Sequence, residues 1–211
     1  LMESASVALG QGGGAEHEHH GPPEAHQSSR IDRQTLGILL FIVTEAMLFG
    51  AFFAAYFFIR VVANSGPWPP DGFALPKAVA GMNTAILVSS SFTVHFALES
   101  IKRSNRKGMI LGLAATFLLG ATFLFIQINE YVHLGFSARE DAFTSVFYCL
   151  TGLHGAHVTV GLMLLAFANI RAWRGHFGPK AKDHLGVEVP GIYWHFVDVM
   201  WLIVYFTVYI L

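Results

Sequence analysis

Four side chains in the second half of the sequence have the types and the spacing to bind a metal ion or to share a proton. His154 and His157 are three residues apart, and so are His195 and Asp198. Residues at this spacing lie on one face of a helix, where two imidazoles can bind a metal. The sequence has no H-E-x-x-H or C-x-x-C motif to complete such a site. We therefore favour an interhelical hydrogen-bond network, with Asp198 paired to His154 or His157, over a metal site.

A single carboxyl group, that of Glu45, interrupts a long apolar run early in the chain. It lies nine residues into that run, with Leu, Ile and Phe at helical spacings around it. A carboxyl group in lipid must face protein or water and needs a hydrogen-bond partner. Two roles fit this residue. It relays protons or tunes a neighbouring subunit, or it joins two helices through one hydrogen bond.

Five long apolar segments must position these polar groups. At a rise of about 1.5 Å per residue, a helix made from any of them spans the roughly 30 Å hydrocarbon core of a bilayer. The sequence therefore predicts an all-α fold, a polytopic membrane bundle of five transmembrane helices. The expected spans are residues 36–59, 78–101, 109–131, 142–170 and 191–211.

The composition agrees with a membrane protein. Hydrophobic residues make up 54% of the chain and charged residues 13%, about half the charged fraction of a typical soluble domain. The formal net charge of −1 gives no sign of a nucleic-acid partner. The single Cys149 excludes a disulfide within the chain. Residues 1–30 are rich in Gly, Pro and His, which predicts a disordered tail before a membrane domain over residues 31–211.

The distribution of basic residues predicts the orientation of the helices. Ten Lys and Arg residues flank the spans on the side of the N-terminus, and three flank them on the other side. Basic residues collect on the cytoplasmic side of membrane proteins. We therefore expect the N-terminus in the cytoplasm and the C-terminus outside. All eight prolines lie outside the spans or in a first turn, so we also expect unbroken helices.

Five ionisable side chains from three helices fall in the middle third of the expected spans: Glu45, His154, His157, His195 and Asp198. Such a number at one depth cannot face lipid, so these groups must meet one another or a cavity. Glu130 and Glu99 fall near opposite membrane surfaces, where interfacial charges are common. The spacing and depth alone predict a buried polar layer without a complete redox or metal site.

Several segments together resemble subunit III of the haem–copper respiratory oxidases, the cytochrome c oxidase family. They are FIVTEAMLFGAFFAAYF around Glu45, WPP at 68–70, QINEY at 127–131, FYCLTGLHGAHVTVG at 147–161 and YWHFVDVMWLIVY at 193–205. The resemblance covers nearly all of residues 34–211. Its most specific part is H-G-x-H-V, followed about 35 residues later by W-H-F-x-D-V-x-W.

The resemblance implies an accessory subunit of a proton-pumping terminal oxidase that reduces oxygen to water. Family members of this kind carry no haem or copper, which lie in subunits I and II, and they have no catalytic residues of their own. They pack on subunit I, hold phospholipids, and support proton uptake and sustained turnover. The implied location is the bacterial plasma membrane. Cytochrome c is the expected electron donor to the complex, with quinol as the alternative, and neither would bind this chain.

Individual positions carry over from the resemblance with different roles. Glu45 matches the mid-membrane carboxyl group of the family, and the two histidine-containing segments match its structural signatures. Arg60, Trp68 and Glu130 are the expected lipid contacts, by local motif. The fuller family members have seven spans, whereas this sequence matches from their third, so a short five-span form is implied. A membrane metalloenzyme using His154, His157, His195 and Asp198 is the remote alternative.

Overall fold

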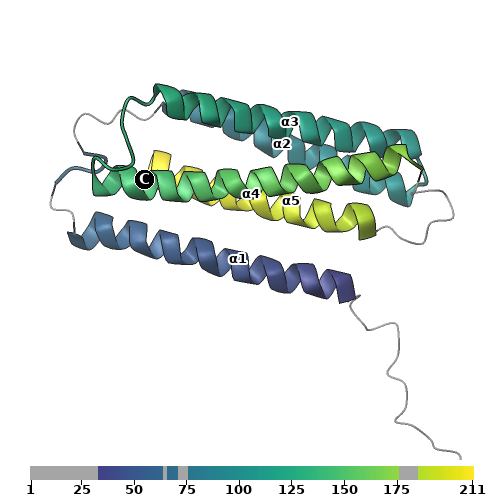
Figure 1. The fold of residues 1–211 in the computed structure, drawn as a ribbon, viewed down its shortest axis with the longest axis horizontal. Helices are drawn as coiled ribbons and strands as arrows, with labels where there is room; N and C mark the ends of the chain where they lie inside the picture. Colours follow the sequence, from purple (N-terminus) through teal and green to yellow (C-terminus); the bar gives the residue numbers. More distant parts are fainter. Residues whose placement is uncertain (1–32, 64–65, 71–75, 176–184) are drawn as a thin grey trace, which may run out of the picture. The chain divides into compact units, whose positions relative to one another are not determined.

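Five long helices make up most of the described part of the chain (Figure 1). The computed structural model describes residues 33–63, 66–70, 76–175 and 185–211. The helices are α1 (Arg33–Phe58), α2 (Lys77–Lys102), α3 (Arg106–His133), α4 (Ala142–Trp173) and α5 (Leu185–Tyr205). Two single π-helical turns, η2 (Ile59–Ala63) and η3 (Phe206–Ile210), extend α1 and α5. The predicted tail, residues 1–30, lies outside the described residues.

All five helices are long and apolar enough to cross a membrane. The described residues contain no strand, so the predicted all-α class with five spans is confirmed. Helices α2 and α3 run past both ends of their expected spans, whereas α4 begins at Ala142 as predicted and runs past its expected end. Polar side chains cap the first turns of α3 and α4. Asn105 accepts a hydrogen bond from Gly108, and Asp141 forms a capping box with Thr144.

The last helix differs from the prediction at its beginning. It begins at Leu185 rather than at residue 191, so Pro190 lies inside the helix, in its second turn. Proline has no backbone N–H to donate, so a proline in a sequence usually indicates a helix boundary. Near the start of a helix only one such bond is lost, and α5 continues through it to Tyr205.

Glycine allows α2 and α3 to pack at very short range. A Cβ atom added to Gly112 would lie 2.8 Å from Cβ of Ala97 and 2.9 Å from the carbonyl oxygen of Thr93. Side-chain hydroxyl groups add a hydrogen bond across this seam, between Thr93 and Thr116 at 2.8 Å. Small residues and hydroxyl groups are the usual means of helix association in lipid, where there is no hydrophobic drive between helices.

The indole ring of Trp194 occupies the centre of the bundle. It is fully buried on α5 and lies between Gly120 of α3 and Gly161 of α4. A Cβ atom at these glycines would lie 2.4 Å and 2.8 Å from the ring. The ring donates a hydrogen bond from Nε1 to Ser90 of α2 at 2.8 Å. One side chain of α5 thus contacts three other helices.

Helix α1 packs along α4 and α5, as Figure 1 shows, and contributes little to the bundle interior. In the most apolar 18-residue stretch of α1, 6% of the residues are buried, whereas in that of α5 56% are buried. Phe49 and Tyr56 are its fully buried side chains. The Tyr56 hydroxyl donates to the carbonyl of Thr207 in η3 at 3.1 Å and accepts from Trp68 Nε1 at 2.9 Å.

Candidate functional site

Glu45 and His157 form a pair between α1 and α4. Nε2 of His157 lies 2.8 Å from Oε2 of Glu45. Glu45 is the thirteenth of the 26 residues of α1, and His157 is the sixteenth of the 32 residues of α4. The pair therefore lies at the midpoint of both helices, at the depth that the sequence predicts. The side chains are 20% and 10% exposed, so the pair is not sealed from the edge of the bundle.

The second ring nitrogen of His157 fixes the position of one proton of this pair. Nδ1 lies 2.8 Å from the carbonyl oxygen of Leu153, which can only accept, so Nδ1 carries a hydrogen. The contact between Nε2 and the carboxyl oxygen needs one further proton. That proton belongs either to an imidazolium facing a carboxylate or to a carboxylic acid facing a neutral imidazole. In both states the pair holds one proton between its partners and is neutral overall.

The surroundings of the pair are aromatic on the bundle side. The ring of Phe49 lies 5.0 Å from that of His157 and is fully buried. The Tyr193 hydroxyl donates to the carbonyl oxygen of His157 at 3.4 Å. The Phe49 ring and the bond to Leu153 hold the imidazole on α4. The carboxyl group reaches it from a helix that is otherwise mostly exposed.

Asp198 of α5 belongs to a second polar site, between α2 and α5. Its Oδ2 accepts a hydrogen bond from the hydroxyl group of Ser91. The same hydroxyl oxygen lies 3.3 Å from Nδ1 of His195. Asp198 is 4% exposed, and its Oδ1 has no partner among the described residues. The expected pairing of Asp198 with His154 or His157 is therefore not what the structure shows, because Ser91 takes that place.

His154 has an aromatic environment instead of a polar one. It is fully buried, with ring centroids 4.8 Å from Trp201 and 5.8 Å from Phe123. Neither ring nitrogen has a hydrogen-bond partner among the described residues. The ring of Trp201 is in turn held by a bond from Nε1 to Thr84 of α2 at 2.9 Å. His154 thus packs as a flat ring and does not join either acid.

The five predicted polar residues therefore form separate sites rather than one centre. Across the described parts of the chain, no group of three or more His, Cys, Asp or Glu side chains is placed to hold a metal ion. The two acids differ in partner, in helix pair and in exposure. The chemistry this arrangement supports is the holding of one proton by Glu45 and His157, together with polar contacts that join α2 to α5.

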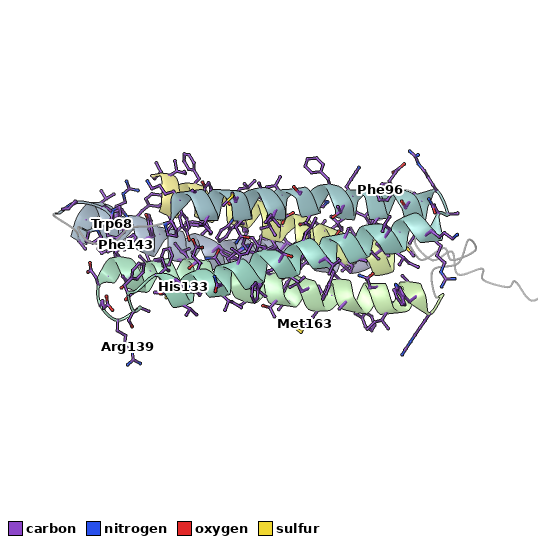
Figure 2. The ribbon with its side chains drawn as sticks, turned by 90° about the horizontal axis from the view of Figure 1, so that it is seen from above. Trp68, Phe96, His133, Arg139, Phe143 and Met163 are labelled. Atoms are coloured by element: carbon purple, nitrogen blue, oxygen red, sulfur yellow. The ribbon has the colours of Figure 1, made fainter. Side chains whose placement is uncertain are left out.

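The three residues expected to contact lipid lie at one end of the helices. Nη2 of Arg60 donates to the carbonyl oxygen of Leu211 at 2.7 Å. Trp68 is partly buried and packs edge-on against Phe143, with centroids 5.0 Å apart (Figure 2). Glu130 is 7% exposed, and both of its carboxyl oxygens lack a partner among the described residues. Arg60 and Trp68 thus make contacts within the chain, whereas the Glu130 carboxyl does not.

Sequence reasoning overlooked the hydroxyl groups of α2. Thr84, Ser90 and Ser91 are the partners of Trp201, Trp194 and Asp198. The signal for them was present, because three consecutive serines, residues 89–91, stand in the middle of an apolar span. Hydroxyl groups at that depth need partners on another helix or on their own backbone.

Comparisons with known proteins give a consistent result. The sequence model of the family described as "Cytochrome c oxidase subunit III" matches residues 17–211. A protein of Thermostichus vulcanus named "Cytochrome c oxidase subunit 3" is 40% identical over 187 residues, which cover 88% of this chain and 91% of that protein. Its namesake in Synechocystis sp. is 38% identical over 200 residues, covering 94% and 81%. The namesake in Gallus gallus is 40% identical over 178 residues, covering 82% and 67%.

Proposed function

Because the chain belongs to the cytochrome c oxidase subunit III family, we propose that it is the accessory, non-redox subunit of a proton-pumping terminal oxidase that reduces oxygen to water. The family relation makes it part of an oxidoreductase complex. We assign haem and copper to partner subunits I and II, and packing on subunit I to this chain. The separation of its histidines into different environments supports this assignment, since they share no common centre among the described residues.

The hydrogen bond between Glu45 and His157 is the main structural support for a role in proton uptake. A pair that holds one proton at the middle of a membrane can exchange it with a path in a neighbouring subunit, because its net charge stays near zero while the proton is held. The 20% exposure of the Glu45 side chain leaves one side of the carboxyl group open to such a neighbour. We propose that the pair supports proton uptake by the complex.

The substitution Glu45→Gln tests this role without removing the bond. A glutamine amide can donate to His157 Nε2 while Nδ1 still donates to Leu153, so the contact persists and the exchangeable proton is lost. We expect an assembled complex with unchanged haem content. Its oxygen turnover during proton pumping should be altered, or should decay sooner. The measurement is oxygen consumption by the reconstituted oxidase, followed over many turnovers.

The control for this experiment is Glu99→Gln, which removes an exposed carboxyl group that pairs with Arg103 at 3.0 Å. We expect this variant to match the wild type in both haem content and turnover. Loss of haem from the Glu45→Gln complex would instead make Glu45 an assembly determinant. Turnover identical to wild type under all conditions would reduce Glu45 to a packing group.

We further propose cytochrome c rather than quinol as the electron donor, and the bacterial plasma membrane as the location. The three relatives named above are all called cytochrome c oxidase subunits. An absorption spectrum of the complex that copurifies with this chain tests both the assignment of haem to partners and the haem type. A colourless chain that purifies alone in mild detergent would contradict the proposal.

A further inference from the structure

Four side chains near the end of α3 bury polar atoms that lack a hydrogen-bond partner among the described residues. They are Gln127, Glu130 and Tyr131 of α3 and Tyr209 of η3, which we call the Gln127 cluster. The unpaired atoms are the oxygen and nitrogen of the amide, both oxygens of the carboxyl group and the two phenol oxygens. Gln127 and Tyr209 are each 2% exposed, and Glu130 is 7% exposed. Buried polar atoms are nearly always paired, so this concentration of them indicates a bound group.

The members of the cluster come together from separate elements. The rings of Tyr131 and Tyr209 both pack against the Phe147 ring of α4, with centroids 6.5 Å and 6.0 Å away. Both phenol hydroxyl groups lie close enough to Gln127 to interact with its amide, although neither forms a hydrogen bond of normal geometry. Both also interact electrostatically with Glu130. The polar atoms of α3 and η3 therefore face one region inside the bundle.

Glu130 connects this cluster to the surface of the bundle. It lines a cavity of about 270 Å³ between the start of α2 and the end of α3, and the other three members of the cluster do not line it. Glu130 is the twenty-fifth of the 28 residues of α3. A helix of that length is about 42 Å long, whereas the hydrocarbon core is roughly 30 Å thick, so the last turns reach the aqueous edge of the membrane. Dissolved ions at that edge can approach the Glu130 carboxyl group through the cavity.

Basic side chains at this end of the bundle do not pair with the carboxyl group. Arg60 is bound to a backbone carbonyl oxygen, and Figure 2 shows Arg139 pointing away from the helices. Lys77 is exposed at the first position of α2 and makes no bond to Glu130. His133 lines the same cavity, but its Nδ1 lies 2.7 Å from a backbone carbonyl oxygen one turn earlier in α3. A positive charge beside the carboxyl group therefore has to come from outside the described part of the chain.

The atoms of the cluster indicate the kind of ion. Five of the six unpaired atoms are oxygens, from a carboxyl group, an amide and two phenols. Hard oxygen ligands of this kind suit alkali and alkaline-earth cations, whereas zinc and copper favour imidazole and thiolate ligands. The four side chains carry one carboxyl group between them, that of Glu130. A monovalent cation therefore leaves the cluster neutral, whereas a divalent cation leaves a buried positive charge.

A proton on Glu130 is the simplest alternative to a bound cation. It would remove the negative charge, but its one O–H group could pair with only one other member of the cluster. The remaining oxygens would stay buried without a partner. An ion that contacts several oxygens at once pairs with them together, so the number of unpaired oxygens favours the ion over the proton.

We propose that the Gln127 cluster binds one alkali-metal cation. The Glu130 carboxylate supplies the negative charge, and the amide and phenol oxygens are the neutral ligands. Because these ligands come from α3 and η3, the bound ion joins two elements at one end of the bundle and stabilises their packing. The proposal needs only the membrane-spanning bundle and does not depend on the proposed role in the oxidase.

Thallium(I) locates such a site in the wild-type complex that contains this chain. This ion replaces alkali-metal cations and is identified by its anomalous X-ray scattering. In crystals soaked in thallium(I) acetate, we expect an anomalous peak beside the Glu130 carboxyl group that an excess of sodium weakens. No peak at Glu130, or ordered water alone between the same oxygens, would overturn the proposal.

Thermal unfolding of the complex measures what the ion contributes to stability. Sodium chloride is exchanged for N-methylglucamine chloride at constant ionic strength, so that only the small cation changes. We expect sodium to raise the thermal midpoint of this chain. Glu130→Gln should need about tenfold more sodium for the same rise, because the charged ligand is lost. Tyr209→Phe keeps the ring on Phe147 and removes one neutral ligand, so it should need a smaller excess of sodium.

The control Glu99→Gln removes an exposed carboxyl group at the other end of α2, where it pairs with Arg103 at 3.0 Å. Sodium should stabilise this variant as much as it stabilises the wild type. A sodium response that Glu130→Gln leaves unchanged would come from another part of the complex and would contradict the site. Haem content is measured in the same preparations. Loss of haem bears on the proposed function, whereas loss of the sodium response with normal haem content bears on this site alone.

Discussion

Glu45 and Asp198 are both acids within membrane-spanning helices, but the protein holds them in different ways. Asp198 is 4% exposed and is bound by Ser91 within the closely packed pair α2 and α5. Glu45 is the only ionisable residue in the apolar run of α1, and its side chain is 20% exposed where it meets His157. The same chemical group is therefore sealed in one place and accessible in the other.

The difference follows from the helices that carry the two acids. Helix α5 fills the bundle, with Trp194 and Trp201 fully buried and bonded to hydroxyl groups of α2. Among the described residues, helix α1 lies on the outside and packs mainly on α4, α5 and its own extension η2. It reaches η3 through the hydrogen bond from Tyr56 to Thr207. The hydrogen bond from Ser91 to Asp198 joins α2 to α5 inside the bundle. The Glu45 carboxyl group is partly exposed, as the proposed exchange with a neighbouring subunit requires.

Glycine substitutions should give the largest difference in stability between the bundle interior and α1. Gly120→Ala places a Cβ atom 2.4 Å from the buried Trp194 ring. Overpacking of a filled interior costs about 1–3 kcal/mol, and more where the neighbour is a rigid ring. Gly50→Ala in α1 meets no atom within 4 Å. Thermal unfolding of the complex in mild detergent should show a large loss for the first variant and none for the second.

Equal stability of the two glycine variants would contradict the division into a filled bundle and an open helix. Gly161→Ala provides a second measurement on the filled side, since its Cβ atom would lie 2.8 Å from the same ring. We expect Gly161→Ala to lose thermal stability as Gly120→Ala does, and not to keep it as Gly50→Ala does.

The sequence predicted the five spans and the depth of the polar groups, because both depend on local hydropathy and helix rise. It did not predict which polar groups meet. Asp198 was expected to bond His154 or His157 on another helix, yet Ser91 is its partner. Pairing depends on how each helix is rotated about its axis, and spacing along one helix carries no information about its neighbour's rotation.

Hydropathy predicted the start of α4 at Ala142 but not the other helix starts. Asn105 and Asp141 set the starts of α3 and α4 through their caps. Pro190 seemed to mark the start of α5, although the helix begins five residues earlier. The burial of Glu130 was equally hidden, because its place near a helix end suggested an interfacial charge. Tyr209, on η3, comes near Gln127 and Glu130 of α3 only in the folded bundle.

Removing the hydrogen-bond partner of each acid should also destabilise the two sites unequally, with a smaller difference in thermal stability than between the glycine variants. Ser91→Ala takes the hydroxyl donor from Asp198, which has no other partner among the described residues. An unpaired buried acid costs about 1–3 kcal/mol or more. His157→Leu takes the partner from Glu45, whose partly exposed carboxyl group can still reach a partner in a neighbouring subunit of the complex. We expect Ser91→Ala to lower the thermal midpoint of the complex more than His157→Leu does.

A larger loss from His157→Leu would reverse the comparison and make the Glu45 pair the main link between α1 and the bundle. Proteolysis of the segment of chain between η2 and α2 distinguishes the two cases. Its rate should rise in His157→Leu if the pair holds α1 in place, and should stay at the wild-type value if it does not.

Two threonine substitutions should give the smallest difference in stability between the bundle interior and α1. Thr84→Val keeps the shape of the side chain but removes the oxygen that accepts from Trp201 Nε1 at 2.9 Å. The indole N–H is then buried without a partner, at a cost of about 1 kcal/mol. Thr44→Val in α1 removes an exposed hydroxyl that bonds only the carbonyl of Phe41, so its effect should stay within about 0.5 kcal/mol. Unfolding of the two variants in one detergent measures the difference. A loss in Thr44→Val as large as that in Thr84→Val would mean that α1 is covered by a partner in the complex, and that its exposure belongs to the isolated chain alone.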